Sequence, residues 1–282
     1  MISTRLTNKG NAGTFFRLAR KLVTIALNPK ALSLHVAAKR EALRQEELNT
    51  LWRDQDYILG HIASCTKSFY EANKGVTELE HQVGRYLNMR AICNEITASG
   101  LTGDVVEFGT WQGLGLILLG QSFSTDRTRR KLIGIDSYEG LPESSTIWRK
   151  GEFSNTSVES VRTNIARRVA GTDHLSVELI KGWFSDKSVR ERLYATCTEL
   201  TLVHFDADLA SSTTQALALV TPYLVDRKKS VYFLFDDWGC HPDEVPDAFL
   251  SWLAAEGPAL KLQAHKLSST RFTRYYKITF DR

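Results

Sequence analysis

The sequence predicts a doubly wound α/β fold with a mainly parallel, seven-stranded sheet and a helical N-terminal extension. Three observations carry this prediction. Short apolar runs alternate with helical patterns from residue 103 onwards, the last two strand-like runs lie too close together for a helix between them, and residues 1–75 contain helical patterns alone. Alternating strands and helices are typical of a parallel sheet covered by helices on both faces.

The first 75 residues form the predicted extension, and residues 76–282 form the predicted main domain. Apolar residues between 15 and 26 recur at helical spacing, with Arg17, Arg20 and Lys21 between them. Such a basic amphipathic helix packs on the main domain or on a second subunit, lies on an anionic membrane surface, or serves as an organellar transit segment. These alternatives stay open, and we keep a homo-oligomer and a peripheral membrane contact of this helix as predictions.

The main domain begins with a predicted helix at 76–99. Five apolar runs then alternate with helical segments, and their near-continuous hydrophobicity is typical of strands buried on both faces of a parallel sheet. The predicted strands are 105–108, 131–135, 176–180, 200–205 and 230–235. The predicted helices between and after them are 113–122, 156–170, 186–195, 211–223 and 243–256.

The end of the chain breaks this alternation. Residues 260–267 and 272–280 both show strand patterns, and only the four residues 268–271 separate them, so the two strands are predicted to pair as an antiparallel hairpin. Five parallel strands followed by a hairpin resemble the sheet of class I S-adenosylmethionine-dependent methyltransferases, whereas a nicotinamide-binding domain keeps a helical crossover before its sixth strand.

Composition and charge restrict the function. With 43% hydrophobic and 24% charged residues the chain has the balance of a globular protein, and its four cysteines include no CxxC pair, which favours a reducing, cytoplasmic setting. No stretch reaches the roughly 18 apolar residues of a membrane span. Residues 1–40 hold eight Lys or Arg and no acid, so the remainder, with 28 bases and 32 acids, is net acidic. Because the basicity belongs to a tail, no nucleic-acid partner is predicted.

A glycine-rich turn follows the first predicted strand. Glu107 precedes Gly109, Trp111 lies inside the turn, and Gly113 and Gly115 open the next helix. Glycines permit a tight reversal and the close approach of a ligand to backbone N–H groups. A dinucleotide site requires the spacing GxGxxG, and an acid at Glu107 repels a pyrophosphate but attracts the positively charged methionine end of S-adenosylmethionine. This charge argument favours S-adenosylmethionine.

The second predicted strand ends at Asp136, at a position where α/β nucleotide folds commonly bind ribose hydroxyls. By itself this acid fits a nicotinamide dinucleotide equally well, and it also fits a structural role as a helix cap or turn former. Next to the glycine-rich turn, the ribose-binding interpretation is favoured.

Four carboxylates follow the fourth and fifth predicted strands: Asp206 and Asp208 after the fourth, and Asp236 and Asp237 after the fifth. Consecutive parallel strands end at the same edge of a sheet, so we expect these side chains to meet. Unpaired negative charges so close together repel one another, and a hard divalent cation, Mg²⁺ or else Mn²⁺ or Ca²⁺, relieves that repulsion. The alternative is that each pair caps the following helix. Two pairs on neighbouring strands favour a metal or catalytic role.

Five segments of the main domain resemble the macrocin O-methyltransferase family, class I methyltransferases that act on sugar hydroxyls of macrolides and related glycosylated compounds. The segments are VEFGTWQG (106–113), DSYEGLPE (136–143), KGWF (181–184), VHFDADL (203–209) with the Ser-Thr pair at 212–213, and DDW (236–238). Carried over by position, the resemblance implies Asp206, Asp236 and Asp237 as metal ligands and Asp208 as the general base. The chain departs from the family at Ala210, where a tyrosine is usual.

The resemblance also implies where the cofactor binds. Glu107 and Gly109 would line its methionine end, and Asp136 would bind its ribose. The remaining candidate cofactor-binding residues are Thr110, Trp111, Gly113, Ser137, Gly182, Trp183, Phe184 and Asp206, of which 182–184 would lie near the adenine.

These residues predict an O-methyltransferase that uses S-adenosylmethionine and Mg²⁺ to methylate a hydroxyl of a sugar or glycosylated small molecule. Coordination to Mg²⁺ would lower the pKa of the hydroxyl, Asp208 would take its proton, and the oxygen would attack the sulfonium methyl. His204 and His241 are rival bases. Two alternative functions stay open: a catechol-like phenol as the acceptor, and a catalytically lapsed cofactor-binding protein that docks through its basic N-terminus.

Overall fold

The computed structural model describes Lys39 and residues 77–169, 172–225, 229–238, 244–269 and 272–281. The chain divides into two units, Met1–Gly60 and His61–Arg282, and the strands and helices below belong to the second. The predicted helical extension and its membrane contact lie outside the described residues and stay predictions. Among the helices that the structure describes, none is long and apolar enough to cross a membrane.

A seven-stranded sheet forms the centre of the second unit, in the order β3-β2-β1-β4-β5-β7-β6. Strands β1 to β5 are parallel, whereas β7 is antiparallel to both of its neighbours, β5 and β6. The strands are β1 (Asp104–Phe108), β2 (Arg130–Asp136), β3 (Leu175–Lys181), β4 (Leu200–Phe205), β5 (Val231–Phe235), β6 (Leu262–Ser269) and β7 (Arg274–Phe280). The predicted doubly wound sheet with its terminal hairpin is confirmed.

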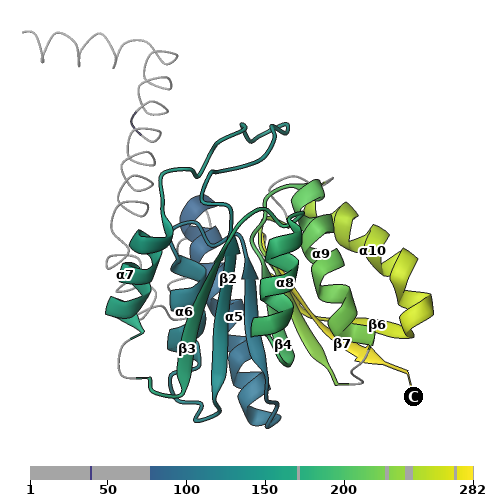
Figure 1. Cartoon of the computed structure of the whole chain (residues 1–282). Helices are drawn as coiled ribbons and strands as arrows, with labels where there is room; N and C mark the ends of the chain where they lie inside the picture. The colour runs from purple at the N-terminus through teal and green to yellow at the C-terminus, as the bar shows by residue number, and fades with distance from the viewer. Residues whose placement is uncertain are drawn as a thin grey trace, which may run out of the picture. The chain divides into compact units, whose positions relative to one another are not determined.

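Helices cover both faces of this sheet. Figure 1 shows α8, α9 and α10 in front of the sheet and α5 and α6 behind it, and α7 packs beside α6. The helices are α5 (Thr77–Ala98), α6 (Leu114–Ser122), α7 (Val158–Arg168), α8 (Lys187–Thr196), α9 (Ala210–Val225) and α10 (Val245–Leu260). This three-layer arrangement brings the carboxyl ends of all five parallel strands to one edge of the sheet.

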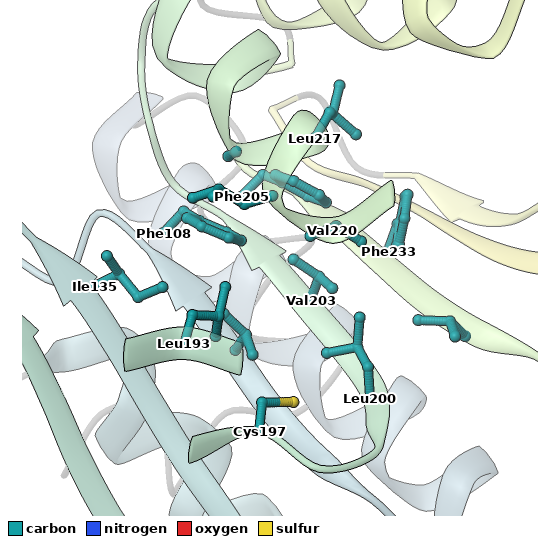
Figure 2. Packing of buried hydrophobic residues seen from close by; sticks show 14 of the residues in the cluster. Phe108, Ile135, Leu193, Cys197, Leu200, Val203, Phe205, Leu217, Val220 and Phe233 are labelled. Atoms are coloured by element: carbon teal, nitrogen blue, oxygen red, sulfur yellow. The ribbon is translucent and has the colours of Figure 1, made fainter. Parts of the chain in front are cut away.

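Phenylalanine side chains of neighbouring strands form the core next to that edge. Phe108, Phe205 and Phe235 are register partners in β1, β4 and β5. Their rings stack in a row, with centroids 5.8 Å apart between the first two and 4.6 Å apart between the last two. Figure 2 shows Phe108 and Phe205 in the same layer as Leu193 of α8 and Leu217 of α9.

The residues that follow this phenylalanine row are Gly109, Asp206 and Asp236, of which the two aspartates carry polar side chains. The amides of the two aspartates donate to the carbonyl oxygens of Phe108 and Phe205, both at 2.9 Å. Successive side chains of a strand point to opposite faces. The two aspartates therefore point away from the phenylalanine layer, toward the face of the sheet that α5 covers.

One strand differs from the expectation that all five apolar runs are buried on both faces. Within β3 only Leu179 and Ile180 are buried, and the residues before them are half-buried or exposed in alternation. The reason is its position, because β3 lies at one edge of the sheet and β2 is its single strand neighbour among the described strands.

Candidate active site

The turn between β1 and α6 adopts backbone conformations that favour glycine. Gly109 and Gly113 have φ angles of 87° and 89°, in the left-handed region. A Cβ atom on Gly109 would lie 1.8 Å from the backbone oxygen of Asp206. Trp111 has a φ of 41°, and its Nε1 donates to Oδ1 of Asn155 at 2.9 Å. The glycine-rich turn thus passes directly beside the end of β4.

Asp136 lies at the end of β2 and holds the same turn. Its Oδ2 accepts hydrogen bonds from the amides of Thr110 and Trp111, both at 2.8 Å, and its Oδ1 accepts from the amide of Tyr138 at 2.6 Å. Burial raises the pKa of Asp136, and the three amides oppose this shift. Asp136 therefore has the structural role that the sequence left open. Its oxygens keep further lone pairs, and ribose binding stays a prediction.

Glu107 and His204 are register partners in β1 and β4 and form a buried pair. Oε2 of Glu107 lies 2.9 Å from Nδ1 of His204. A Cβ atom on Gly115 would lie 2.0 Å from the same Oε2, which explains the third glycine of the turn. Burial raises the pKa of Glu107, and His204 opposes this shift. The other oxygen, Oε1, is buried and has no hydrogen-bond partner among the residues that the structure describes. An orphaned acidic acceptor fits a cofactor with a cationic donor group.

The candidate adenine-binding residues follow β3, next to Asp136. The amide of Gly182 donates to the backbone oxygen of Asp136 at 2.9 Å. The ring of Phe184 packs edge-on against Phe108, with centroids 5.2 Å apart, and the amide of Trp183 begins a turn that leads into α8. The structure thus brings the candidate residues after β1, β2 and β3 to one edge of the sheet.

The segment between β2 and α7 connects the glycine-rich turn with α9. It begins at Ser137, which is buried. Further along, the ring of Phe153 packs edge-on against Trp111, with centroids 5.4 Å apart. The hydroxyl of Ser211, in the first turn of α9, donates to the carboxylate of Glu143. The segment therefore spans the distance from the candidate cofactor site to the helix that follows β4.

The first carboxylate of each acidic pair is bound by side chains of α5. Nη1 of Arg85 donates to Oδ2 of Asp206 at 2.9 Å and to Oδ2 of Asp236 at 2.8 Å. Nε2 of His81 lies 2.7 Å from Oδ1 of Asp236. Burial opposes protonation of His81, but Asp236 outweighs it and raises the pKa of this imidazole to about 9. Against the effect of burial, His81 and Arg85 hold the pKa of Asp236 well below its ordinary value.

The second carboxylate of each pair lies where the chain turns away from the strand. Asp208 and Asp237 have φ angles of 56° and 55°, a conformation that is uncommon for residues other than glycine and clusters at functional sites. Burial, with Asp237 as the leading carboxylate neighbour, raises the pKa of Asp208 well above its ordinary value. The amide of Ala210 at the start of α9 donates to Oε2 of Glu244 at 2.7 Å, so Glu244 supplies this helix cap.

These four acids form the aspartate cluster (Asp206, Asp208, Asp236 and Asp237), and its residues fit a divalent cation. Four carboxylates against the cationic His81 and Arg85 leave a formal charge of −2. Two members of the cluster, Asp206 and Asp236, lie close to His204. Each of these three residues offers one ligand atom, and the three atoms lie within 4.8 Å of one another. Oxygen-rich donor sets of this kind suit Mg²⁺ and Mn²⁺.

Sequence reasoning did not find the partners of this cluster. His81 and Arg85 stand at i and i+4 of α5 and therefore on one face of the helix, but a buried polar face and a solvated one look alike in a single sequence. Glu143 and Glu244 were missed as well, because their contacts join segments that are far apart in the chain. His241, one of the rival bases, lies outside the described residues.

Solved structures share this architecture. The O-methyltransferase NovP matches with a TM-score of 0.56 over 71% of this chain and 81% of that chain, at 22% identity. The calicheamicin methyltransferase CalS11 matches with a TM-score of 0.54 over 82% of this chain and 92% of that chain, at 19% identity. The fold is that of the class I methyltransferases.

The family follows from the sequence match. Residues 81–252 match the family model described as Macrocin-O-methyltransferase (TylF), and the chain belongs to this family. The matched region includes the glycine-rich turn, the aspartate cluster and both of its α5 partners.

Two curated relatives from streptomycetes are similar to part of the chain. The 8-demethyl-8-(2,3-dimethoxy-alpha-L-rhamnosyl)-tetracenomycin-C 4'-O-methyltransferase of Streptomyces olivaceus is 30% identical over 148 residues, 49% of this chain and 54% of that protein. The demethyldecarbamoylnovobiocin O-methyltransferase of Streptomyces niveus is 27% identical over 169 residues, 55% of this chain and 60% of that protein. The matches therefore span less than two thirds of either relative.

Proposed function

We propose that the chain is an S-adenosylmethionine-dependent O-methyltransferase that acts on a hydroxyl of a sugar or glycosylated small molecule and depends on a divalent cation. The observation that carries this proposal is the aspartate cluster beside the glycine-rich turn, in a member of the macrocin O-methyltransferase family. The Streptomyces olivaceus relative is named for 4'-O-methylation of a rhamnosyl compound, which supports a sugar hydroxyl as the acceptor.

The cofactor supplies an electrophilic methyl group on a positively charged sulfur. Oε1 of Glu107 would accept a hydrogen bond from its amino group, since this buried oxygen lacks a partner in the described part of the chain. Asp136 would bind the ribose through lone pairs that the turn amides leave unused. Gly109 gives the turn the close approach that such a ligand needs.

A bound divalent cation supplies Lewis acidity, which lowers the pKa of a coordinated hydroxyl. Asp206, Asp236 and Asp237 would hold it. The first two are fixed by sheet hydrogen bonds to the neighbouring strands and by the guanidinium of Arg85, so little conformational entropy remains to be lost on binding.

Asp208 is the proposed general base. The left-handed conformation of its backbone lets its side chain leave the strand direction, and burial among carboxylates raises its pKa, which increases its affinity for a proton. The rival His204 is fully buried, and its Nδ1 is paired with Glu107.

The proposal is tested by replacing the base. Asp208→Asn should lower kcat by roughly 10² to 10⁴, the usual contribution of general base catalysis, whereas calorimetric affinity for S-adenosylhomocysteine should change by less than about twofold. Asp247→Asn, an exposed position in the first turn of α10, is the matched control and should keep full turnover. An Asp208→Asn enzyme with unchanged kcat would exclude this base.

The same assay decides the acceptor and the cation. Glycosides and catechol-like phenols are offered side by side, with and without EDTA. Turnover of glycosides that EDTA abolishes is the expected result, since a metal-held hydroxyl is the proposed nucleophile. Full activity in EDTA would remove the cation from the mechanism, and turnover of phenols alone would change the acceptor class. Cofactor binding without turnover of either class would favour a catalytically lapsed protein.

A further inference from the structure

Arg85 is the side chain that joins the two halves of the aspartate cluster. Its Nη1 atom donates to Asp206 from β4 and to Asp236 from β5, at 2.9 and 2.8 Å. Its side chain is 7% exposed, that of Asp236 is fully buried, and that of Asp206 is 25% exposed. A single nitrogen thus connects the ends of two adjacent strands.

The remaining contacts of Arg85 fix the direction of its guanidinium. Nη2 donates to Oε1 of Gln82, one turn earlier in α5, at 2.5 Å. Nε is buried and has no hydrogen-bond partner among the described residues. A buried donor without a partner lowers the stability of the fold. The guanidinium nevertheless keeps the orientation in which Nη1 donates to both carboxylates.

The two carboxylates are restrained to different degrees. Both oxygens of Asp236 are engaged, Oδ2 by Arg85 and Oδ1 by His81. For Asp206, the side-chain hydrogen bond in the described part of the chain is the one from Arg85. Without it, a partly exposed carboxylate next to another negative charge would turn toward water.

We propose that Arg85 is a positioning residue that holds Asp206 and Asp236 in the arrangement that binds a divalent cation. This inference rests on the proposed function, since it names the residue that prepares the cation site. Arg85 acts through the aspartates and does not itself touch the cation. Side chains that orient metal ligands from behind typically change metal affinity by about 10- to 100-fold when they are removed.

The sign of the effect separates this role from simple charge balance. If Arg85 only neutralised negative charge, its removal would strengthen the attraction of the remaining carboxylates for a dication. If it holds the ligands in place, its removal weakens binding in spite of the extra negative charge. The two explanations therefore predict opposite changes in the dissociation constant.

The experiment is a titration of the full chain with Mn²⁺, followed by electron paramagnetic resonance of the free ion, without acceptor or turnover. For Arg85→Gln we expect the Kd for Mn²⁺ to rise about 10- to 100-fold relative to the unsubstituted chain. Arg85→Lys keeps a single donor near both carboxylates but loses the planar fork, and its Kd should rise by about three- to tenfold.

Glu95→Gln is the matched control for the docking of α5. Glu95 is half-buried ten residues after Arg85 in the same helix, and its Oε1 accepts a hydrogen bond from the hydroxyl of Tyr232 in β5 at 2.8 Å. This variant should unfold at a lower temperature and keep its Kd for Mn²⁺ within about twofold. A general loosening of α5 would instead raise the Kd of Glu95→Gln as well and would overturn the positioning role.

Equal or tighter Mn²⁺ binding by Arg85→Gln would also overturn it, while leaving the proposed methyltransferase function intact. If Arg85→Gln does not fold, the comparison of Arg85→Lys with Glu95→Gln decides, and a lysine variant that binds as tightly as the unsubstituted chain contradicts the proposal. If the unsubstituted chain binds no Mn²⁺, the cation dependence of the proposed function fails at that step and the role of Arg85 fails with it.

Discussion

The site has no room for a side chain at position 109, where the sequence has glycine. Its φ of 87° lies in the left-handed region, and a Cβ atom would lie 1.8 Å from the backbone oxygen of Asp206. Gly100 has a comparable φ of 63°, but nothing lies within 4 Å of a Cβ placed there. The two glycines therefore separate the cost of an unusual backbone angle from the cost of a backbone clash.

We expect Gly100→Ala to lower the free energy of unfolding by about 1 kcal/mol, from backbone strain alone. Gly109→Ala adds a collision with backbone that cannot rotate away, and we expect a total loss of roughly 3 kcal/mol. It should also abolish calorimetric binding of S-adenosylhomocysteine, because the turn must move to admit the methyl group. Urea unfolding of both variants measures the difference, and equal losses would contradict the role assigned to Gly109.

The site residues at the ends of strands could be predicted from the sequence. The helix residues that contact those strand ends could not. Asp206 and Asp236 could be placed beside each other because a buried parallel strand has one polar end at the sheet edge. Arg85 could not, since its position on α5 says nothing about which strand the helix crosses. The turn-forming hydrogen bonds of Asp136 were foreseen as an alternative, because acids after strands commonly accept from local amides.

At the scale of elements, the alternation of apolar runs and helical patterns was sufficient to predict the sheet. The strands lie within a few residues of their predicted bounds because each run is flanked by polar or glycine-rich segments. The order of the strands within the sheet was harder to predict from the sequence. The half-exposed β3 follows from its place at the sheet edge, and apolar content alone does not indicate which strand is outermost.

Residues 141–152 form a loop whose ends are joined by backbone hydrogen bonds, a feature that the sequence did not reveal. The amide of Leu141 donates to the oxygen of Glu152, and the amide of Gly151 donates to the oxygen of Leu141, both at 2.9 Å. Glu143 joins this loop to Ser211 of α9. Because α9 begins two residues after the proposed base, we expect this loop to contact an acceptor.

Ile147 is 45% exposed at the tip of this loop. Ile147→Ser removes its apolar side chain and leaves both anchoring segments and the contact between the rings of Trp148 and Phe153. We expect the melting temperature and the affinity for S-adenosylhomocysteine to be unchanged. The KM for the acceptor should rise about tenfold, which corresponds to about 1.4 kcal/mol of lost binding. Steady-state kinetics with a saturating methyl donor measures this, and an unchanged KM would show that the tip does not contact the acceptor.

At the scale of the whole molecule, charge is separated along the chain. Residues 1–40 contain eight bases and no acid, whereas the remainder has 28 bases and 32 acids. The main domain gathers part of its acidity in the aspartate cluster, where His81 and Arg85 offset two of the four negative charges. The basic extension is therefore the part of the chain with the greatest excess of positive charge for an anionic surface.

This separation makes the membrane contact testable in the full chain. Each base near an anionic bilayer contributes about 1 kcal/mol, so replacing Arg17, Arg20 and Lys21 together by glutamine should weaken co-sedimentation with phosphatidylserine vesicles by roughly 100-fold. The control variant removes three exposed bases of the main domain, Arg127, Arg129 and Lys150. It loses the same net charge and should sediment like the unsubstituted chain. If both variants and the unsubstituted chain sediment equally, the predicted basic helix has no membrane role, and the alternatives that remain are packing on the main domain or on a second subunit and a role as a transit segment.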